Sequence, residues 1–256
     1  MARKIAIATQ KGGVGKTTTA LFLNYELNRR GYKTLLIDFD PQRNASDTYR
    51  AKIENHATLY DVLCAEEPII NAIQETEAGD IVASDPLLAD AENKLTQIGR
   101  EYILKEALEK IDDKYDFMIF DTPPNLGILT TNALTAADEV IIPVTADRYS
   151  IQGVADLRKT IAGVKKYSNP NLLIKGLLLV MFVENEKLSK EVIADLPMIA
   201  EQLGTNLFNS FIRRCVETKK SQAERKHLYD YAPKSTTSVD YITFVDELIN
   251  GGVKNG

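Results

Sequence analysis

Residues 9–18 read Thr-Gln-Lys-Gly-Gly-Val-Gly-Lys-Thr-Thr, directly after the apolar run Ile-Ala-Ile-Ala at 5–8 and directly before Ala-Leu-Phe-Leu at 20–23. This order predicts a strand, a glycine-rich loop and a helix. Glycines let successive backbone N–H groups turn toward one ligand, and the positive end of the following helix points at the same ligand. The stretch therefore predicts a loop that binds the phosphates of a nucleoside triphosphate.

The loop departs from the general phosphate-loop pattern by carrying a second lysine, Lys11, five residues before Lys16. A solvated lysine beside a tight turn is the alternative interpretation. The run KGGVGKTT resembles the deviant Walker A motif of the ParA/MinD ATPases. In that family the first lysine reaches across a dimer interface to the nucleotide of the other subunit. The resemblance implies that Lys11 and Lys16 are catalytic and that ATP is bound by the following residues: Lys11, Gly12, Gly13, Val14, Gly15, Lys16, Thr17 and Thr18.

Length and composition are those of an ordinary globular protein of 256 residues, with a net charge of −5. No apolar run approaches the roughly 20 residues that a membrane span needs, and the N-terminus lacks a signal-peptide pattern. We therefore expect a cytoplasmic protein. Cys64 and Cys215 stand far apart without a CxxC pair, so the sequence indicates neither a zinc site nor a disulfide.

Apolar strand patterns alternate with amphipathic helix patterns along the whole chain. The expected strands cover residues 4–8, 34–37, 80–84, 116–121, 138–145 and 172–180, and the expected helices cover residues 16–30, 58–63, 86–95, 99–111 and 150–167. This alternation predicts an α/β fold, a mostly parallel twisted sheet with helices on both faces. We expect one phosphate-loop ATPase domain over residues 1–256, with no N-terminal DNA-reading domain and a flexible polar tail at 250–256.

Acidic residues end two of the expected strands. Asp38 and Asp40 follow the second strand, and Asp121 closes the run Phe-Met-Ile-Phe. Strand ends are where open α/β sheets place their ligands, although turns also favour aspartate. The family resemblance implies that Asp40 orients the attacking water, that Asp38 lies nearer the metal, and that Asp121 holds the water shell of Mg²⁺ while Thr17 is a direct ligand. Arg43 stands where the family usually has Gly, which predicts a different loop shape.

Residues 213–227 contain six Lys or Arg and two Glu, a local charge of plus four in an acidic chain. Such a run is often a solvated helix face. ParA-like ATPases, however, use basic residues of this region to bind DNA without reading its sequence, which requires only phosphate neutralisation. The resemblance thus implies DNA contacts by Arg213, Arg214, Lys219, Lys220, Arg225 and Lys226.

Among the branches of the family, the sequence favours a ParA-type partition ATPase. This implies a slow, partner-stimulated ATPase that forms an ATP-bound homodimer, binds non-specific double-stranded DNA on the nucleoid, and responds to a ParB-like centromere-binding protein. A MinD-like ATPase recruited to membranes is the alternative. The tail at 250–256 is polar and glycine-rich, whereas membrane docking requires an amphipathic helix, so we expect no membrane partner.

Overall fold

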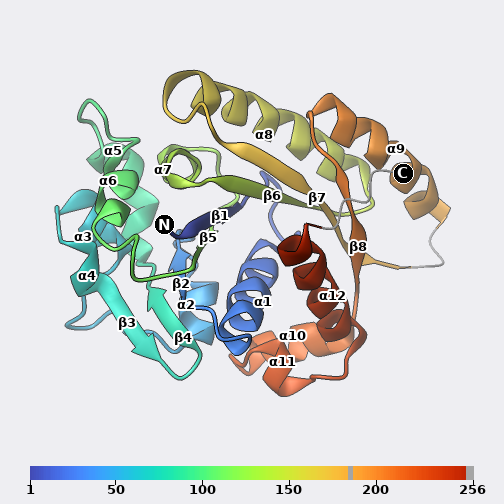
Figure 1. Ribbon diagram of the computed structural model, residues 1–256, viewed down its shortest axis with the longest axis horizontal. Helices are drawn as coiled ribbons and strands as arrows, with labels where there is room; N and C mark the ends of the chain where they lie inside the picture. Colours follow the sequence, from blue (N-terminus) through green and yellow to red (C-terminus); the bar gives the residue numbers. More distant parts are fainter. Residues whose placement is uncertain (184–186, 252–256) are drawn as a thin grey trace.

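The structure is a computed structural model that describes residues 1–183 and 187–251, except for the side chains at 148–151 and 187–192. An eight-stranded sheet runs through the middle of the molecule in the order β3-β4-β2-β5-β1-β6-β7-β8 (Figure 1). All neighbouring strands are parallel except β3 and β4, which form an antiparallel pair at one edge. The predicted fold class is confirmed.

The strands are β1 (Arg3–Ile7), β2 (Thr34–Asp38), β3 (Ile73–Thr76), β4 (Gly79–Val82), β5 (Phe117–Asp121), β6 (Glu139–Val144), β7 (Leu173–Phe182) and β8 (Leu207–Arg213). The helices are α1 (Lys16–Arg29), α2 (Asn44–Thr48), α3 (Leu59–Cys64), α4 (Ile69–Ala72), η1 (Pro86–Asp90), α5 (Ala91–Lys94), α6 (Ile103–Glu109), α7 (Ile128–Ala136), α8 (Arg148–Tyr167), α9 (Lys187–Gln202), α10 (Val216–Ala223), α11 (Leu228–Tyr231) and α12 (Thr236–Asn250).

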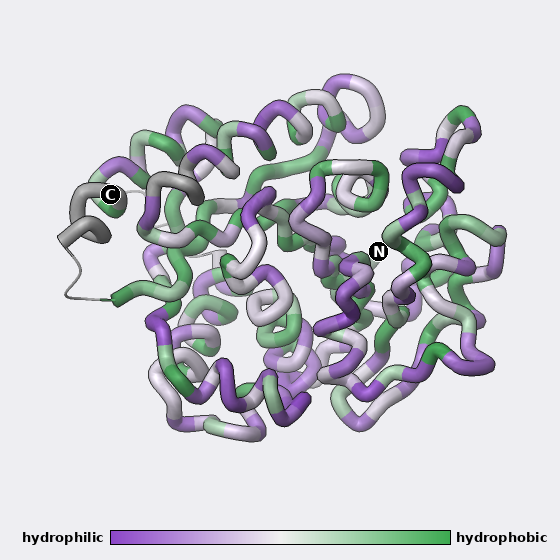
Figure 2. Tube along the Cα trace, turned by 180° about the vertical axis from the view of Figure 1, so that it is seen from behind, coloured by the Kyte–Doolittle hydropathy of each residue, from purple (hydrophilic) through white to green (hydrophobic). Residues whose placement is uncertain are grey.

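Two hydrophobic layers cover the two faces of the sheet. One contains buried residues of α1, α11 and α12, and the other contains buried residues of α3, α6, α7, α8 and α9. Figure 1 shows α1 and α12 side by side on one side of the sheet and α8 on the other, and Figure 2 shows hydrophobic stretches along the central strands. Burial of the sheet on both faces explains why its central strands are almost continuously apolar.

Two predicted helices are shorter than expected. The helix expected at 86–95 is split into the 3-10 turn η1 and the single turn α5, because Asp85 caps the backbone N–H of Leu87 and Pro86 begins a tight turn. The helix expected at 99–111 begins only at Ile103, since Gly99 has φ +81° and does not continue a right-handed helix. The strand expected at 80–84 corresponds to β4, whereas β3, its antiparallel pairing with β4, α7 and β8 were not predicted. Residues 252–256 of the predicted tail lie outside the described residues.

The topology brings three predicted site segments to one edge of the sheet. Asp38 at the end of β2 lies opposite Asp121 at the end of β5, and β5 lies next to β1, which leads into the glycine-rich loop. The carboxyl ends of parallel strands meet at the same edge, where α/β sheets bind ligands. The strand order alone therefore places these three segments next to one another.

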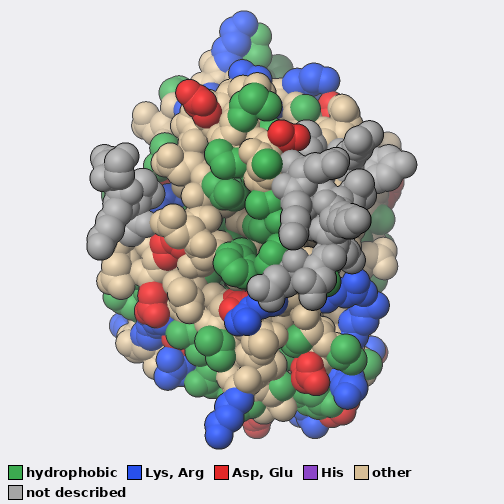
Figure 3. All heavy atoms as spheres, turned by 90° about the vertical axis from the view of Figure 1, so that its right-hand side faces the viewer, with side chains coloured by type: hydrophobic (Ala, Val, Ile, Leu, Met, Phe, Trp, Pro, Cys, Tyr) green, Lys and Arg blue, Asp and Glu red, His purple; other side chains and the backbone are tan. Residues whose placement is uncertain are grey.

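Edge strand β8 leaves apolar side chains at the surface. Phe211 of β8 and Met181 of β7 are 43% and 40% exposed. Figure 3, which views the molecule from the side of β8 and α9, shows hydrophobic side chains gathered in the middle of that face. Phe211 also packs edge-on against Phe182, which ties the ends of the two strands together.

Candidate nucleotide site

The glycine-rich loop leaves β1 and enters α1 through two left-handed residues. Gly13 has φ +72° and Gly15 has φ +76°, conformations that side chains rarely adopt. Val14 between them is buried, which anchors the loop to the core beside α1. Gly15 is the N-cap of α1 and has no capping side chain, so the first backbone N–H groups of the helix remain available. This is the geometry of an anion-binding helix start.

Lys16 is buried beside the loop, with 6% of its surface exposed. Its ammonium group donates a hydrogen bond of 3.1 Å to the carbonyl of Lys11. Burial lowers the pKa of Lys16, while the nearby charges of Asp121 and Asp40 raise it. A buried ammonium group between a glycine-rich loop and two acids is poised to bind phosphate oxygens.

Asp121 is fully buried, and both of its carboxylate oxygens lack a hydrogen-bond partner among the described residues. Its pKa is raised mainly by burial and by the adjacent Asp38, although the Thr17 hydroxyl and Lys16 oppose that shift. Unpartnered buried acceptors are costly, and a hydrated divalent cation would satisfy them. Asp121 and the Thr17 hydroxyl therefore have oxygen atoms of the kind that Mg²⁺ binds, and their role as metal residues stays a prediction.

Asp38 lies in register with Asp121, but its carboxylate already accepts three hydrogen bonds. One comes from the backbone N–H of Asp40, and two come from the backbone and hydroxyl of Ser46. Burial raises the pKa of Asp38 to about 6, against the effect of these bonds. The Asp38 carboxylate thus already holds the turn at Asp40 and the start of α2 at Ser46, and a metal contact would compete with these hydrogen bonds.

Asp40 begins a tight turn after β2. Its side chain accepts a hydrogen bond from the backbone of Gln42, and its carbonyl accepts one from the backbone of Arg43. Arg43 has φ +60°, the left-handed conformation that glycine favours. The backbone at Arg43 thus has the conformation that glycine favours, and the expected difference in loop shape stays a prediction.

Lys11 forms an ion pair within the subunit. Its Nζ lies 2.6 Å from Oδ2 of Asp147, between β6 and α8, and both side chains are about one third exposed. Helix α8 approaches the loop closely, since a Cβ placed on Gly153 would lie 3.7 Å from the backbone nitrogen of Lys11. The second lysine is therefore held at the edge of the loop by the segment that begins α8.

The predicted DNA-binding residues fall into two groups. Arg213 forms two side-chain hydrogen bonds with Asp240 of α12, and its backbone N–H binds the same carboxylate, so it joins β8 to α12. The other five are exposed on or beside α10: Arg214, Lys219, Lys220, Arg225 and Lys226. The second group is available for phosphate contacts, whereas Arg213 is used within the fold.

The basic helix α10 contacts the phosphate-loop helix directly. Gln222 of α10 donates a hydrogen bond of 3.2 Å to the hydroxyl of Thr18. Arg225, just after α10, lies 3.5 Å from the carboxylate of Asp47 in α2, the short helix that follows the Asp40 turn. The basic segment is thus connected both to the loop and to the segment after β2.

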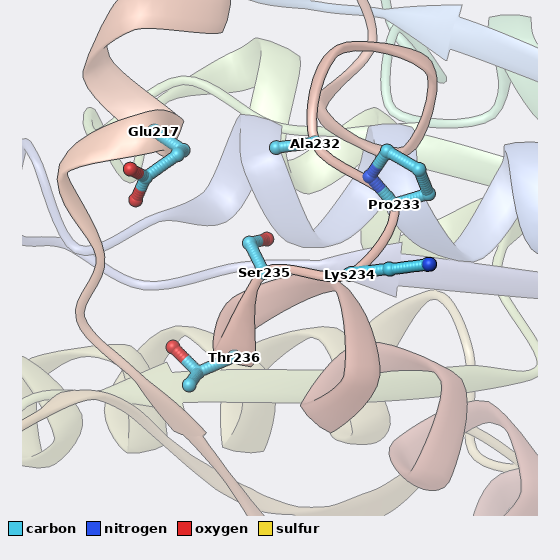
Figure 4. A pocket seen from close by; sticks show the side chains of 6 residues that line it. All are labelled: Glu217, Ala232, Pro233, Lys234, Ser235 and Thr236. Atoms are coloured by element: carbon cyan, nitrogen blue, oxygen red, sulfur yellow. The ribbon is translucent and has the colours of Figure 1, made fainter.

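A shallow pocket of about 540 Å³ lies between the start of α10 and the loop before α12. Figure 4 shows Glu217 on one side of it and Ser235 and Lys234 on the other. None of its lining residues belongs to the glycine-rich loop, so this hollow is distinct from the phosphate site.

Sequence reasoning missed several residues that shape the site. Ser46 contacts Asp38 from eight residues further along the chain, whereas Ser84 contacts Asp40 and Asp147 contacts Lys11 from distant segments. The one available signal was position: Ser84 and Asp147 both follow the end of a strand, at the edge where the sheet places its ligands.

The fold and the loop define the class of protein as a phosphate-loop nucleotide hydrolase. A protein-family profile described as an AAA domain matches residues 2–174. The chromosome partitioning protein ParA of Caulobacter vibrioides is 37% identical over 254 residues, covering 97% of this chain and 94% of that protein. The sporulation initiation inhibitor protein Soj of Bacillus subtilis is 36% identical, covering 98% of this chain and all of that protein. The chain therefore belongs to the ParA/Soj family of partition ATPases.

Solved structures support the same fold. Cobyrinic acid a,c-diamide synthase from Mycobacterium smegmatis, solved with bound ADP and magnesium, has a TM-score of 0.84 and 31% identity, covering 100% of this chain and 97% of that one. Apo McdA of Cyanothece has a TM-score of 0.86 at 24% identity, covering 97% of this chain and 100% of that one. At this identity the similarity supports a shared fold and no shared function.

None of the helices in the described part of the chain combines the length and apolar character of a membrane span.

Proposed function

We propose that this partition ATPase closes as an ATP-bound homodimer, binds DNA without reading its sequence, and leaves the DNA when ATP is hydrolysed. The observation that carries the proposal is the hydrogen bond between Thr18 and Gln222, which joins the phosphate-loop helix to the basic helix α10. A change at the loop on binding ATP would thereby alter the position of the basic side chains. A ParB-like centromere-binding protein is the expected stimulator of hydrolysis.

ATP and Mg²⁺ are the cofactors, and the loop residues fit them. The N–H groups at the start of α1 and the Lys16 ammonium would bind phosphate oxygens, and Thr17 and Asp121 would hold the metal. Mg²⁺ supplies charge neutralisation for the transferred phosphoryl group. Asp40 orients the attacking water, while Lys11, released from Asp147, offsets charge on the nucleotide of the other subunit.

The dimer acts as a switch because only a ligand with different affinity for two states can shift their populations. Contacts of Lys11 with the γ-phosphate end of the other subunit's nucleotide would exist only in the closed dimer. Closure places two copies of the basic segment on one assembly, and hydrolysis removes the contact that favours closure.

We further propose that residues 1–256 act as one ATPase domain, located in the cytoplasm and on the nucleoid.

The deciding experiment compares non-specific DNA binding by the purified protein with ATP, with ADP and without nucleotide. Retention on a DNA fragment of arbitrary sequence is expected only with ATP, together with a doubling of mass in light scattering. Equal DNA binding in all three states would contradict the proposal. Co-sedimentation with anionic liposomes serves as the parallel arm, and ATP-dependent recovery with the liposomes alone would instead favour membrane recruitment.

A further inference from the structure

We infer that Ser84 is a positioning residue for ATP hydrolysis, because it closes a buried ring of hydrogen bonds that fixes the main chain of Asp40. This inference rests on the proposed role of Asp40 in orienting water. It assigns a function to two serines, Ser46 and Ser84, that lie outside the motifs of the nucleotide site.

The ring runs through four residues. The Ser84 hydroxyl donates to the carbonyl of Asp40 at 2.6 Å, and the Ser84 backbone N–H donates to the Ser46 hydroxyl at 2.9 Å. The Ser46 hydroxyl donates to Oδ2 of Asp38 at 2.7 Å. Oδ1 of Asp38 accepts the backbone N–H of Asp40 at 3.0 Å, which closes the ring.

The ring holds Asp40 from both sides of its Cα. Its N–H is bound by Asp38 and its C=O is bound by Ser84, so both peptide groups that flank the residue are fixed. The Asp40 side chain itself is partly exposed, and the charge of its carboxylate acts on Lys16. The main chain of Asp40 is therefore fixed, and its carboxylate, which also accepts the backbone N–H of Gln42, lies near enough to Lys16 to raise the pKa of that lysine, an arrangement that favours precise placement of a water molecule.

The residues that support Asp40 lie in the interior, next to the sheet. Asp38, Ser46 and Ser84 are all fully buried. Asp38 ends β2 and Ser84 follows β4, and these two strands pair directly through residues 35–37 and 80–82. The ring thus fixes the position of Asp40 relative to the sheet. Because the ring is buried, solvent water cannot replace a hydrogen-bond partner that a mutation removes.

A purely structural role for the serines predicts a different outcome from a positioning role. If the ring only stabilises the fold, removing a hydroxyl lowers the melting temperature and leaves turnover per folded molecule unchanged. If the ring positions Asp40, removal lowers kcat while nucleotide affinity is retained, since the phosphate loop does not contribute to the ring.

The test measures ATP turnover, binding of a fluorescent ATP analogue and melting temperature for Ser84→Ala. We expect kcat to fall by about tenfold, as for loss of one buried hydrogen bond that aligns a reacting group, and analogue affinity to stay within about twofold. Ser168→Ala is the matched control, because it also deletes a buried hydroxyl, one that binds Thr135 and the Val164 carbonyl away from the site. Its kcat should equal that of the unmodified protein.

Asp40→Ala is measured in parallel so that the two hypotheses can be separated. If Asp40→Ala loses turnover but Ser84→Ala keeps a normal kcat, the proposed role of the ring is wrong and the proposed role of Asp40 stands. Normal turnover in Asp40→Ala would instead overturn the proposed role of Asp40. If Ser84→Ala does not fold, Ser46→Ala, which breaks the ring at the Asp38 and Ser84 backbone contacts, must show the same fall in kcat; unchanged kcat there would also overturn the inference.

Discussion

Lys11 is bound by Asp147 of its own subunit, with 2.6 Å between Nζ and Oδ2. If Lys11 reaches the nucleotide of the other subunit, this ion pair must break when the dimer forms. The pair is about one third exposed on each side, so it contributes no more than about 0.2–1 kcal/mol. The ion pair with Asp147 is therefore a weak restraint on Lys11, the residue that the proposed dimer needs at its interface.

Replacing Asp147 by Asn tests this restraint. The dimerisation constant should rise by about twofold to thirtyfold with a non-hydrolysable ATP analogue, because closure breaks one such pair in each subunit, at about 0.2–1 kcal/mol a pair, and the variant has neither. The dimerisation constant is measured by analytical ultracentrifugation. Asp156→Asn is the control, since Asp156 lies on α8, the helix that begins directly after Asp147, but pairs with the exposed Lys159. Unchanged or weaker dimerisation of Asp147→Asn would count against the restraint.

Removing the lysine itself should have a larger effect. Lys11→Ala is expected to abolish ATP-dependent dimerisation while leaving nucleotide binding measurable, because Lys16 and the loop N–H groups remain. Light scattering with ATP and titration of a fluorescent ATP analogue give the two readouts. A Lys11→Ala protein that dimerises normally with ATP would refute the role across the interface.

Asp40→Ala should separate closure from hydrolysis. The change removes the carboxylate that orients water but leaves the phosphate loop and Asp121 intact, so ATP binding and dimerisation should persist while turnover falls by about 100-fold. The expected product is an ATP-bound dimer that stays on DNA. Release from DNA after ATP is added, at the rate of the unmodified protein, would contradict this role of Asp40.

Much of the site could be predicted because its central residues are consecutive. The strand, glycine loop and helix around Lys16 are read from local sequence, and Asp121 follows from the apolar run that precedes it. Ser84 and Asp147 could not be found in this way. Each contacts the site only after separate strands have paired, and a serine or aspartate at a strand end has no local pattern that reveals its partner.

The same limit applies to the basic segment. Its charge is plain from the sequence, but the sequence does not show that Arg213 is engaged by Asp240 while Lys219 and Lys220 are exposed. Strand β4 matches the strand expected at 80–84, but β3 and its antiparallel pairing with β4 escaped prediction, because the four residues of β3 lack a strong alternating pattern. Long-range pairing decides these features.

The exposed lysines of α10 should account for part of the salt dependence of DNA binding. Changing Lys219 and Lys220 together to Ala should reduce the magnitude of the slope of log K against log salt by up to about four for the bound dimer, since each subunit loses two lysines and each phosphate contact contributes about 0.9. The slope is measured with ATP on a fragment of arbitrary sequence. Lys105 and Lys110 changed to Ala serve as the control, with the same loss of charge on exposed positions of α6 and just after it. Equal slopes for all three proteins would exclude α10 from the interface.

His227 should make the protein acid-sensitive. Its ring stacks on Tyr25 at 4.0 Å, and its Nδ1 accepts the backbone N–H of Tyr229. Burial lowers the pKa of His227 to about 4. The unfolded chain, with an ordinary histidine pKa of about 6.5, then binds the proton more readily, so stability is lost as the pH falls from about 6.5 toward 4. The loss attributable to this group approaches about 3 kcal/mol at the lower end.

His227→Asn isolates that effect. Asparagine can still cap the N-terminus of α11, but it neither stacks on Tyr25 nor titrates, so the variant should be less stable near pH 7 and should lose less stability on acidification. Urea unfolding at intervals between pH 4 and pH 7 gives the free energies. His56→Asn, a change at the other histidine, which is exposed, should follow the profile of the unmodified protein. If His227→Asn loses as much stability as the unmodified protein between pH 6.5 and pH 4, the acid sensitivity arises elsewhere in the molecule.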